Sequence, residues 1–218
     1  MILEKLKNSV ICDDSLHILK QLSDKSIDLV LTDPPYGIGE AKGKNKSRGL
    51  LAKSKDYGNL DWDDKIPNKE YFDEILRVSK NSIIWGGNYF IEYLNNSPCW
   101  LVWDKDNGKT DFADCELAWT NFNTAVRKYK FKWQGMLQEN MGRNKEVRYH
   151  PTQKPVSLFT WCLNNYVKQG SIILDPFGGG GTTAMSCLET NNTYIVIDQC
   201  QSYVDISNER IKNFKSLW

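Results

Sequence analysis

Short apolar runs alternate along the chain with stretches of helical periodicity. The runs have strand length and predict seven core strands, at residues 10–12, 26–31, 82–85, 99–103, 115–119, 171–174 and 193–197. Apolar residues at helical spacing predict helices at about 16–22, 68–80, 89–94, 156–167, 184–189 and 202–214. Asp14 or Ser15 is placed to cap the first of these helices. Strands mostly separated by helices are typical of a largely parallel α/β sheet, here in a single domain over residues 1–218.

A different pattern covers residues 126–133. Tyr129, Phe131 and Trp133 alternate strictly with lysines, which predicts a half-exposed strand outside the seven core strands. Its lysines are Lys128, Lys130 and Lys132. These side chains either contact phosphates or protect an exposed sheet edge from aggregation, and the pattern favours neither interpretation.

Composition is ordinary for a globular protein, with 40% hydrophobic and 25% charged residues among 218. No apolar run has membrane-spanning length, and we expect no signal peptide before the first strand. The six cysteines form no C-x-x-C pair and mostly lie in apolar stretches, which predicts reduced core thiols in a cytoplasmic protein. Two histidines are too few and too scattered for a zinc site.

The net charge is only +1, but basic residues gather in two segments. Residues 37–58 carry six basic and two acidic side chains, and residues 127–150 carry seven and two. Two basic segments on an acidic body predict a polyanion footprint on one surface, although lysine-rich solvated loops are also common. The candidate phosphate contacts are Lys42, Lys44, Lys46, Arg48, Lys128, Lys130, Lys132 and Arg143. The first four belong to a long basic loop at about 37–61, which could fold over a bound substrate.

The stretch Thr32-Asp33-Pro34-Pro35-Tyr36-Gly37 follows the second predicted strand. Prolines cannot continue a β-ladder, and a residue before proline is held extended, so the strand ends in a rigid acidic tip. The Asp33 carboxylate and the Pro34 carbonyl are adjacent acceptors, and Tyr36 adds an aromatic face. This combination suits a planar amine, although a solvated aspartate at a stiffened strand end is the simpler interpretation.

A second loop, Asp175 to Thr183, follows a strand and opens a helix. It lacks the Gly-Lys-Ser/Thr of a phosphate loop and does not fit G-x-G-x-x-G spacing. Its glycines let a ligand approach the backbone, and Asp175 suits the ammonium of an amino acid portion. Asp198 ends the next strand, where an acid is placed for a ribose diol. A plain glycine-rich linker is the alternative.

Three motifs together resemble a known family. DPPY at Asp33 resembles the catalytic motif of amino-methyltransferases that modify adenine N6 or cytosine N4. DPFGGGGTT at Asp175 resembles their S-adenosylmethionine loop, and HPTQKPVSL resembles the motif that precedes it and covers the methionine end of the cofactor. Asp198 and Asp14 match acidic positions of the same family. The order of the motifs is that of the permuted β class, and the resemblance covers nearly the whole chain.

This resemblance implies a Rossmann-like, seven-stranded, mostly parallel sheet with one antiparallel strand and helices on both faces. WGGNYF and DCELAW further resemble stretches of phage and prophage members. The implied catalytic residues are Asp33, Pro34, Pro35 and Tyr36. The implied cofactor-binding residues are Asp14, Asp33, Thr152, Lys154, Asp175, Pro176, Phe177, Gly178, Gly179, Gly181, Thr182, Thr183 and Asp198.

The implied reaction is methyl transfer from S-adenosylmethionine to adenine N6 in double-stranded DNA. Cytosine N4 is the nearest alternative, but the cytosine enzymes more often carry SPPY, so Asp33 favours adenine. RNA as the substrate and an inactive DNA-binding or partner subunit are further alternatives. Methylation at cytosine C5 through Cys99 lacks supporting motifs. The recognition segment, about residues 121–149, is short, so specificity is loose or a second subunit, as in a homodimer, contributes to it.

Overall fold

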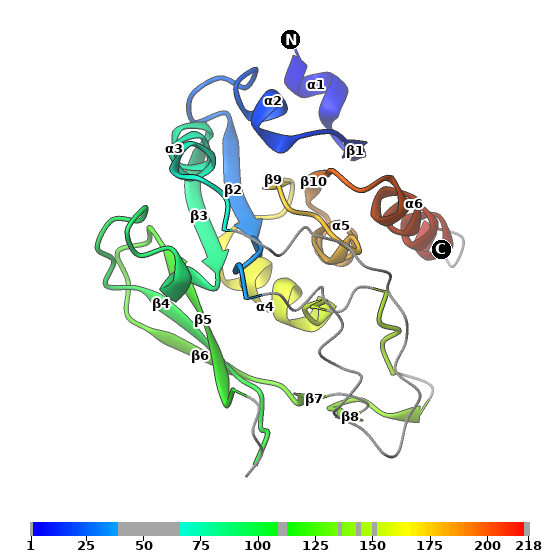
Figure 1. Cartoon of the computed structure of the whole chain (residues 1–218). Coiled ribbons are helices and arrows are strands. Elements are labelled where there is room, and N and C mark those ends of the chain that lie inside the picture. Colours follow the sequence, from blue (N-terminus) through cyan, green and yellow to red (C-terminus); the bar gives the residue numbers. More distant parts are fainter. Residues whose placement is uncertain are drawn as a thin grey trace.

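The computed structural model describes residues 2–38, 66–108, 113–134, 137–142, 145–149 and 152–215. Its main sheet has eight strands in the order β1-β10-β9-β2-β3-β5-β4-β6 (Figure 1). These are β1 (Ser9–Cys12), β2 (Ile27–Thr32), β3 (Ser79–Trp85), β4 (Trp100–Asp104), β5 (Cys115–Thr120), β6 (Arg127–Lys130), β9 (Ile172–Asp175) and β10 (Thr193–Asp198). A separate two-stranded ribbon pairs β7 (Trp133–Gln134) with β8 (Leu137–Gln138).

The predicted count of seven strands is wrong, because the lysine-rich segment at residues 126–133 also joins the sheet. Its first part forms β6, which pairs in parallel with β4 and makes one edge of the sheet. Lysines on one face made this segment look separate from the core, but an edge strand needs only one buried face. The predicted faces are confirmed: Phe131 and Trp133 are buried, while Lys128 and Lys130 are exposed. The ladder of β6 ends at Lys130.

One strand runs against the others, as predicted. β5 pairs antiparallel with both β3 and β4, whereas every other pairing in the main sheet is parallel. The central strand β2 is buried on both faces, with Val30 toward one side and Leu29 and Leu31 toward the other. This explains why its sequence is a continuous apolar run rather than an alternation.

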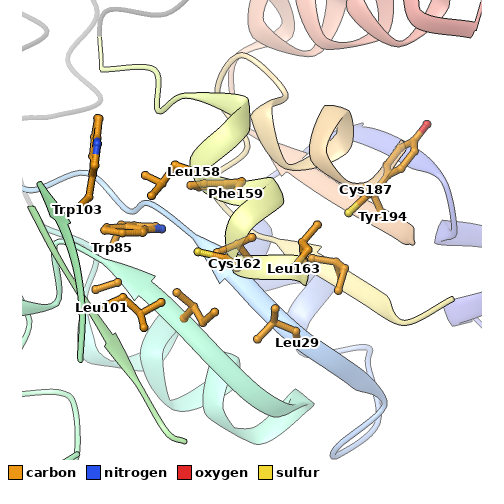
Figure 2. Packing of buried hydrophobic residues seen from close by; sticks show 14 of the residues in the cluster. Leu29, Trp85, Leu101, Trp103, Leu158, Phe159, Cys162, Leu163, Cys187 and Tyr194 are labelled. Carbon is orange, nitrogen blue, oxygen red and sulfur yellow. The ribbon is translucent and has the colours of Figure 1, made fainter. Parts of the chain in front are cut away.

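Helices cover both faces of the sheet. The first face carries α1 (Ile2–Leu6), α2 (Ser15–Leu19) and α3 (Lys69–Val78), and the second carries α4 (Val156–Tyr166), α5 (Thr182–Glu189) and α6 (Gln201–Lys215). Figure 2 shows the core of the second face, where Leu158, Phe159, Cys162 and Leu163 of α4 lie against Leu29, Trp85 and Leu101 of the sheet. The sheet and its two helical layers therefore match the predicted fold class.

Two local features differ from the sequence prediction. Helix α1 lies outside the predicted helices, and the expected helix at 89–94 is a 3₁₀ turn, η4 (Gly87–Tyr89), followed by further turns. The backbone bonds there run between residues three apart, from the Tyr89 amide to the Gly86 carbonyl and from the Tyr93 amide to the Phe90 carbonyl. The left-handed Gly86, at φ +68°, sets this tighter geometry immediately after β3.

All six cysteines are free thiols, but only Cys99, Cys162 and Cys187 are buried. Cys12 and Cys115 are exposed, so the prediction of core thiols holds for only part of the set. None of the helices in the described part of the chain has the length and apolar character that a bilayer span requires.

Candidate active site

Three acidic residues lie at the carboxyl ends of neighbouring parallel strands. Asp33 directly follows β2, Asp175 ends β9 and Asp198 ends β10. The Thr32 hydroxyl donates to Asp175 Oδ1 at 2.6 Å, which joins the first two strand ends. A cavity of about 280 Å³ opens at this edge of the sheet. It is lined by most of the predicted site residues, namely Asp33, Pro34, Pro35, Tyr36, Thr152, Lys154, Asp175, Pro176, Phe177, Gly178, Gly179, Thr182 and Asp198.

The glycine loop is held tightly against β10. The Gly178 amide donates to the Ile197 carbonyl at 2.8 Å, and a Cβ on Gly178 would lie 2.1 Å from Val196 Cγ1. Asp198 Oδ2 accepts from the Gly179 amide at 2.8 Å. Glycine is therefore required here for the close approach of loop and strand, and Asp198 fixes the loop while its carboxylate still faces the cavity.

Asp175 stabilises the same glycine loop through hydrogen bonds to its carboxylate. Its carboxylate accepts from the Thr32 hydroxyl, from the Thr183 hydroxyl and from the Phe177 amide. Burial raises the pKa of Asp175 to about 6, although these hydrogen bonds favour the ionised form. A carboxylate has about four acceptor positions, so Asp175 keeps room for roughly one more bond to a ligand.

Three predicted cofactor residues lie behind the cavity wall. Asp14 caps α2 by accepting from the Leu16 amide at 2.9 Å, and it also accepts from the Tyr71 hydroxyl at 2.8 Å. Gly181 has φ +76°, and a Cβ there would lie 2.6 Å from Ser207 Oγ. Thr183 is fully buried beside Asp175. All three residues therefore support the residues that line the cavity, and Tyr71 rather than Asp14 lines it.

Asp33 is engaged on both carboxylate oxygens. Tyr36 Oη donates to Oδ1 at 2.5 Å, and Lys154 Nζ donates to Oδ2 at 2.5 Å. Lys154 Nζ also donates to Tyr36 Oη at 3.2 Å and lies 3.0 Å from Glu116 Oε2. Glu116 in turn pairs with Lys105. The Asp33 side chain is 18% exposed and that of Lys154 5%, so this alternating chain of charges is largely buried.

Burial and pairing act against each other in this cluster. Burial raises the pKa of Asp33 above 3.8, although Lys154 opposes this. Burial alone would lower the pKa of Lys154, but Asp33 and Glu116 raise it overall. Burial would likewise raise the pKa of Glu116, yet Lys154 and Lys105 lower it to about 2. Lys154 is therefore a stable cation, and Glu116 is a stable anion at neutral pH.

Tyr36 is fixed in position by its neighbours. Its ring stacks on Tyr89 with centroids 4.7 Å apart, and a Cβ on Gly86 would lie 2.0 Å from its Cε1 atom. Tyr89 itself is 44% exposed, so the aromatic pair reaches the surface beside the cavity. Burial, followed by the charge of Asp33, raises the pKa of Tyr36, which keeps its hydroxyl protonated and donating.

Sequence reasoning missed Glu116, Lys105 and Tyr89 as parts of this centre. For Glu116 a signal existed, because a carboxylate interrupts the apolar run of β5. Such a group needs a partner when it is buried. Tyr89 lies in the stretch WGGNYF, whose resemblance to phage and prophage members assigned it no role, and nothing local in the sequence marked Lys105.

The predicted phosphate contacts fall into two groups. Lys42, Lys44, Lys46, Arg48 and Arg143 lie outside the described residues. Lys128 lies 3.3 Å from Asp104, and Lys130 and Lys132 lie 3.1 and 3.4 Å from Asp106. Lys128 and Lys130 lie on the edge strand β6, Lys132 lies beyond its end, and all three have aspartate partners. This arrangement fits edge protection, and phosphate contact stays a prediction.

Comparisons with known proteins find similar sequences and similar folds among methyltransferases. The sequence model of the N6/N4 methyltransferase family, described as DNA methylase, matches residues 97–209, just over half of the chain. The chain is 29% identical to the type II methyltransferase M.HpaI of Haemophilus parainfluenzae, over 93% of this chain and 73% of that protein. The fold is similar to the crystal structure of an M1.HpyAVI–SAM complex, with TM-score 0.57, 19% identity and coverage of 93% and 98%. It also resembles the cytosine-N4-specific PvuII DNA methyltransferase, with TM-score 0.58, 16% identity and coverage of 92% and 84%.

Proposed function

Because this chain belongs to the DNA methylase family, we propose that it transfers a methyl group from S-adenosylmethionine to N6 of adenine in double-stranded DNA. One observation carries the proposal: an acceptor built for an amine, Asp33, shares a cavity with a glycine loop between two further acidic strand ends. A methyl donor and a target amino group can therefore meet in this cavity.

The residues present fit S-adenosylmethionine. Asp198 offers a carboxylate to a ribose diol, and Asp175 keeps about one acceptor position for an ammonium. Tyr71 and Phe177, with ring centroids 5.8 Å apart, supply aromatic surface at the same cavity. Thr152 and Lys154, which the resemblance assigns to the methionine end, also line it. When bound, this cofactor supplies an electrophilic methyl group.

The protein's part in the reaction is to hold and activate the target amine. The exocyclic nitrogen of adenine is a poor nucleophile because its lone pair is conjugated into the ring. Hydrogen bonds to Asp33 and to the Pro34 carbonyl favour a pyramidal nitrogen whose lone pair is free to react, and positioning supplies much of the gain. Asp33 is also the acceptor for the proton that the nitrogen loses. Adenine must first leave the base stack, and the Tyr36–Tyr89 pair offers it aromatic surface.

Adenine is favoured over cytosine N4 by the aspartate at position 33, where the cytosine enzymes that the chain resembles more often have serine. The fold itself also supports cytosine chemistry, since a cytosine-N4-specific enzyme shares it. Cytosine N4 is therefore the second candidate. Identifying the methylated base in DNA from cells that express the protein separates the two candidates.

DNA is the proposed partner, held in part by the basic loop and the recognition segment. The short recognition segment is consistent with loose specificity or with a second copy of the chain on the DNA, and light scattering with and without DNA separates these possibilities. A phage-type origin stays a prediction. A DNA substrate further implies a cytoplasmic enzyme in a bacterial or phage-infected cell.

The test is expression in a methylation-free bacterial strain, followed by sequencing of its DNA for modified bases. N6-methyladenine at a defined or degenerate site is expected. N4-methylcytosine would support the second candidate, and unmodified DNA from cells that contain folded protein would contradict both.

A further inference from the structure

The Lys154 ammonium lies against one of the two carboxylate oxygens with which Asp33 would bind a target amine. It donates to Asp33 Oδ2, and its second hydrogen bond goes to Tyr36 Oη. An ammonium has three N–H donors, so one remains for Glu116 or for a ligand in the cavity that Lys154 lines. Asp33 accepts two of the roughly four bonds that a carboxylate can accept, so an amine can bind beside Lys154 or take its place at Oδ2.

Glu116 is placed to pair with the Lys154 ammonium when an amine replaces that ammonium at Asp33. Its Oε2 atom is buried and accepts no hydrogen bond of good geometry among the described residues, although Lys154 Nζ lies 3.0 Å away. A small rotation of the ammonium would complete this bond, and the ionised state of Glu116 favours it. Lys154 can therefore release Asp33 without becoming an unpaired buried charge.

Asp33 and Lys154 together form an acceptor beside a donor. Adenine presents the complementary pair, an amino N–H next to the unprotonated ring nitrogen N1. Building on the proposed function, we propose that Lys154 recognises the target base by donating to this ring nitrogen while Asp33 accepts from the amino group, and that Glu116 holds Lys154 in place. The buried contact between Lys154 and Asp33 is exchanged for two hydrogen bonds to adenine, so every donor and acceptor stays satisfied. Thymine and guanine carry a protonated ring nitrogen at the corresponding position and are excluded.

The test measures kcat and KM on DNA that carries 1-deazaadenine at the methylated position, with unmodified DNA in parallel. This analogue keeps the amino group but replaces N1 with C–H. Wild-type kcat/KM should fall roughly ten- to a hundredfold on the analogue, the range for losing a hydrogen bond from a charged donor. In Lys154→Met the two DNAs should differ by less than about threefold, because the partner of N1 is already gone. The analogue also differs from adenine in basicity and base pairing. These differences affect both enzymes equally, so they cancel when the wild-type penalty is divided by the Lys154→Met penalty.

Lys105→Met is the matched control, because it removes a cation from Glu116 without touching Asp33, and it should keep the wild-type penalty on the analogue. Glu116→Gln should lower kcat/KM on unmodified DNA and shrink the penalty, while the affinity for S-adenosylmethionine, measured by calorimetry, stays unchanged. Equal wild-type efficiency on both DNAs would overturn the inference even if Lys154→Met failed to fold. So would a full penalty that persists in Lys154→Met. No methylation of unmodified DNA by the wild type would instead contradict the proposed function.

Discussion

Replacing Asp33 with alanine tests the structural and the catalytic role of this residue together. The change removes the 2.5 Å contact with Lys154 and the bond from Tyr36. An uncompensated buried charge costs roughly 3–5 kcal/mol, but Glu116 still lies 3.0 Å from the ammonium and reduces this cost. The loss of a charged hydrogen bond, about 2 kcal/mol, is the better measure. For a domain of this size we expect the unfolding midpoint to fall by about 4–8 °C.

Methyl transfer should fall by roughly a hundredfold or more in Asp33→Ala, as when one preorganised hydrogen-bond partner of a reacting group is removed. The affinity for S-adenosylmethionine should change by less than about threefold, because the glycine loop is braced by Asp175 and Asp198 rather than by Asp33. Three assays on one purified variant give the answer: thermal unfolding, cofactor calorimetry and tritiated methyl transfer to unmethylated DNA.

The double variant Asp33→Ala/Lys154→Met separates the two roles. Without its ammonium the cluster no longer contains an underpaired cation, so stability should return to within about 1 kcal/mol of wild type while transfer stays low. Near-normal transfer by Asp33→Ala would refute the catalytic role. Wild-type stability in the single variant would refute the reasoning about the buried pair.

Three further predictions concern other parts of the site. The raised pKa of Asp175, about 6 against an ordinary 3.8, means that the folded state binds its proton more tightly than the unfolded chain does. Its stabilising contribution is therefore present below pH 4 and lost as pH rises to 6; in urea unfolding, wild-type stability minus that of Asp175→Asn should fall by about 3 kcal/mol across this window, and a rising difference would contradict the assignment. Gly86→Ala should displace Tyr36 and reduce methyl transfer more than tenfold with a stability loss of roughly 1–2 kcal/mol, measured by transfer assay and thermal unfolding; unchanged transfer would show that the ring position is unimportant. Replacing both Lys128 and Lys130 with alanine should flatten the salt dependence of DNA binding by up to about two counterions if they contact phosphates, and an unchanged slope in filter binding would leave them as edge protection only.

The strand ends of the site could be predicted from the sequence because each carries its own local signal. Prolines stop β2 beside Asp33, and glycines follow the acid that ends β9. The parallel α/β pattern then places these ends on one edge, without knowledge of the strand order. The family resemblance assigned Asp14 to the cofactor, whereas in the structure it caps α2, as the sequence pattern predicted, and supports Tyr71. Residue type and position along the chain therefore identified the edge of the sheet where the site lies, but not the direction in which each side chain points.

The partners of Asp33 could not be predicted in this way. Lys154 lies 121 positions further along the chain, and its motif pointed to the cofactor rather than to a carboxylate. Burial decides its role: an ammonium that is 5% exposed must pair with an anion, and only the folded chain shows which anions are near.

The antiparallel strand explains how Glu116 joins this group. The parallel strands of the sheet bring their carboxyl ends to the edge that carries Asp33, Asp175 and Asp198. A strand that runs the other way brings its first residues to that edge instead, and β5 does so: Cys115, its first residue, pairs with Asp104, the last residue of β4. Glu116 therefore reaches Lys154 from the start of a strand that lies between the catalytic strand end and the edge strand β6. Only β4 lies between β5 and β6, so Glu116 stands close in the sheet to the strand that carries the predicted phosphate contacts Lys128 and Lys130.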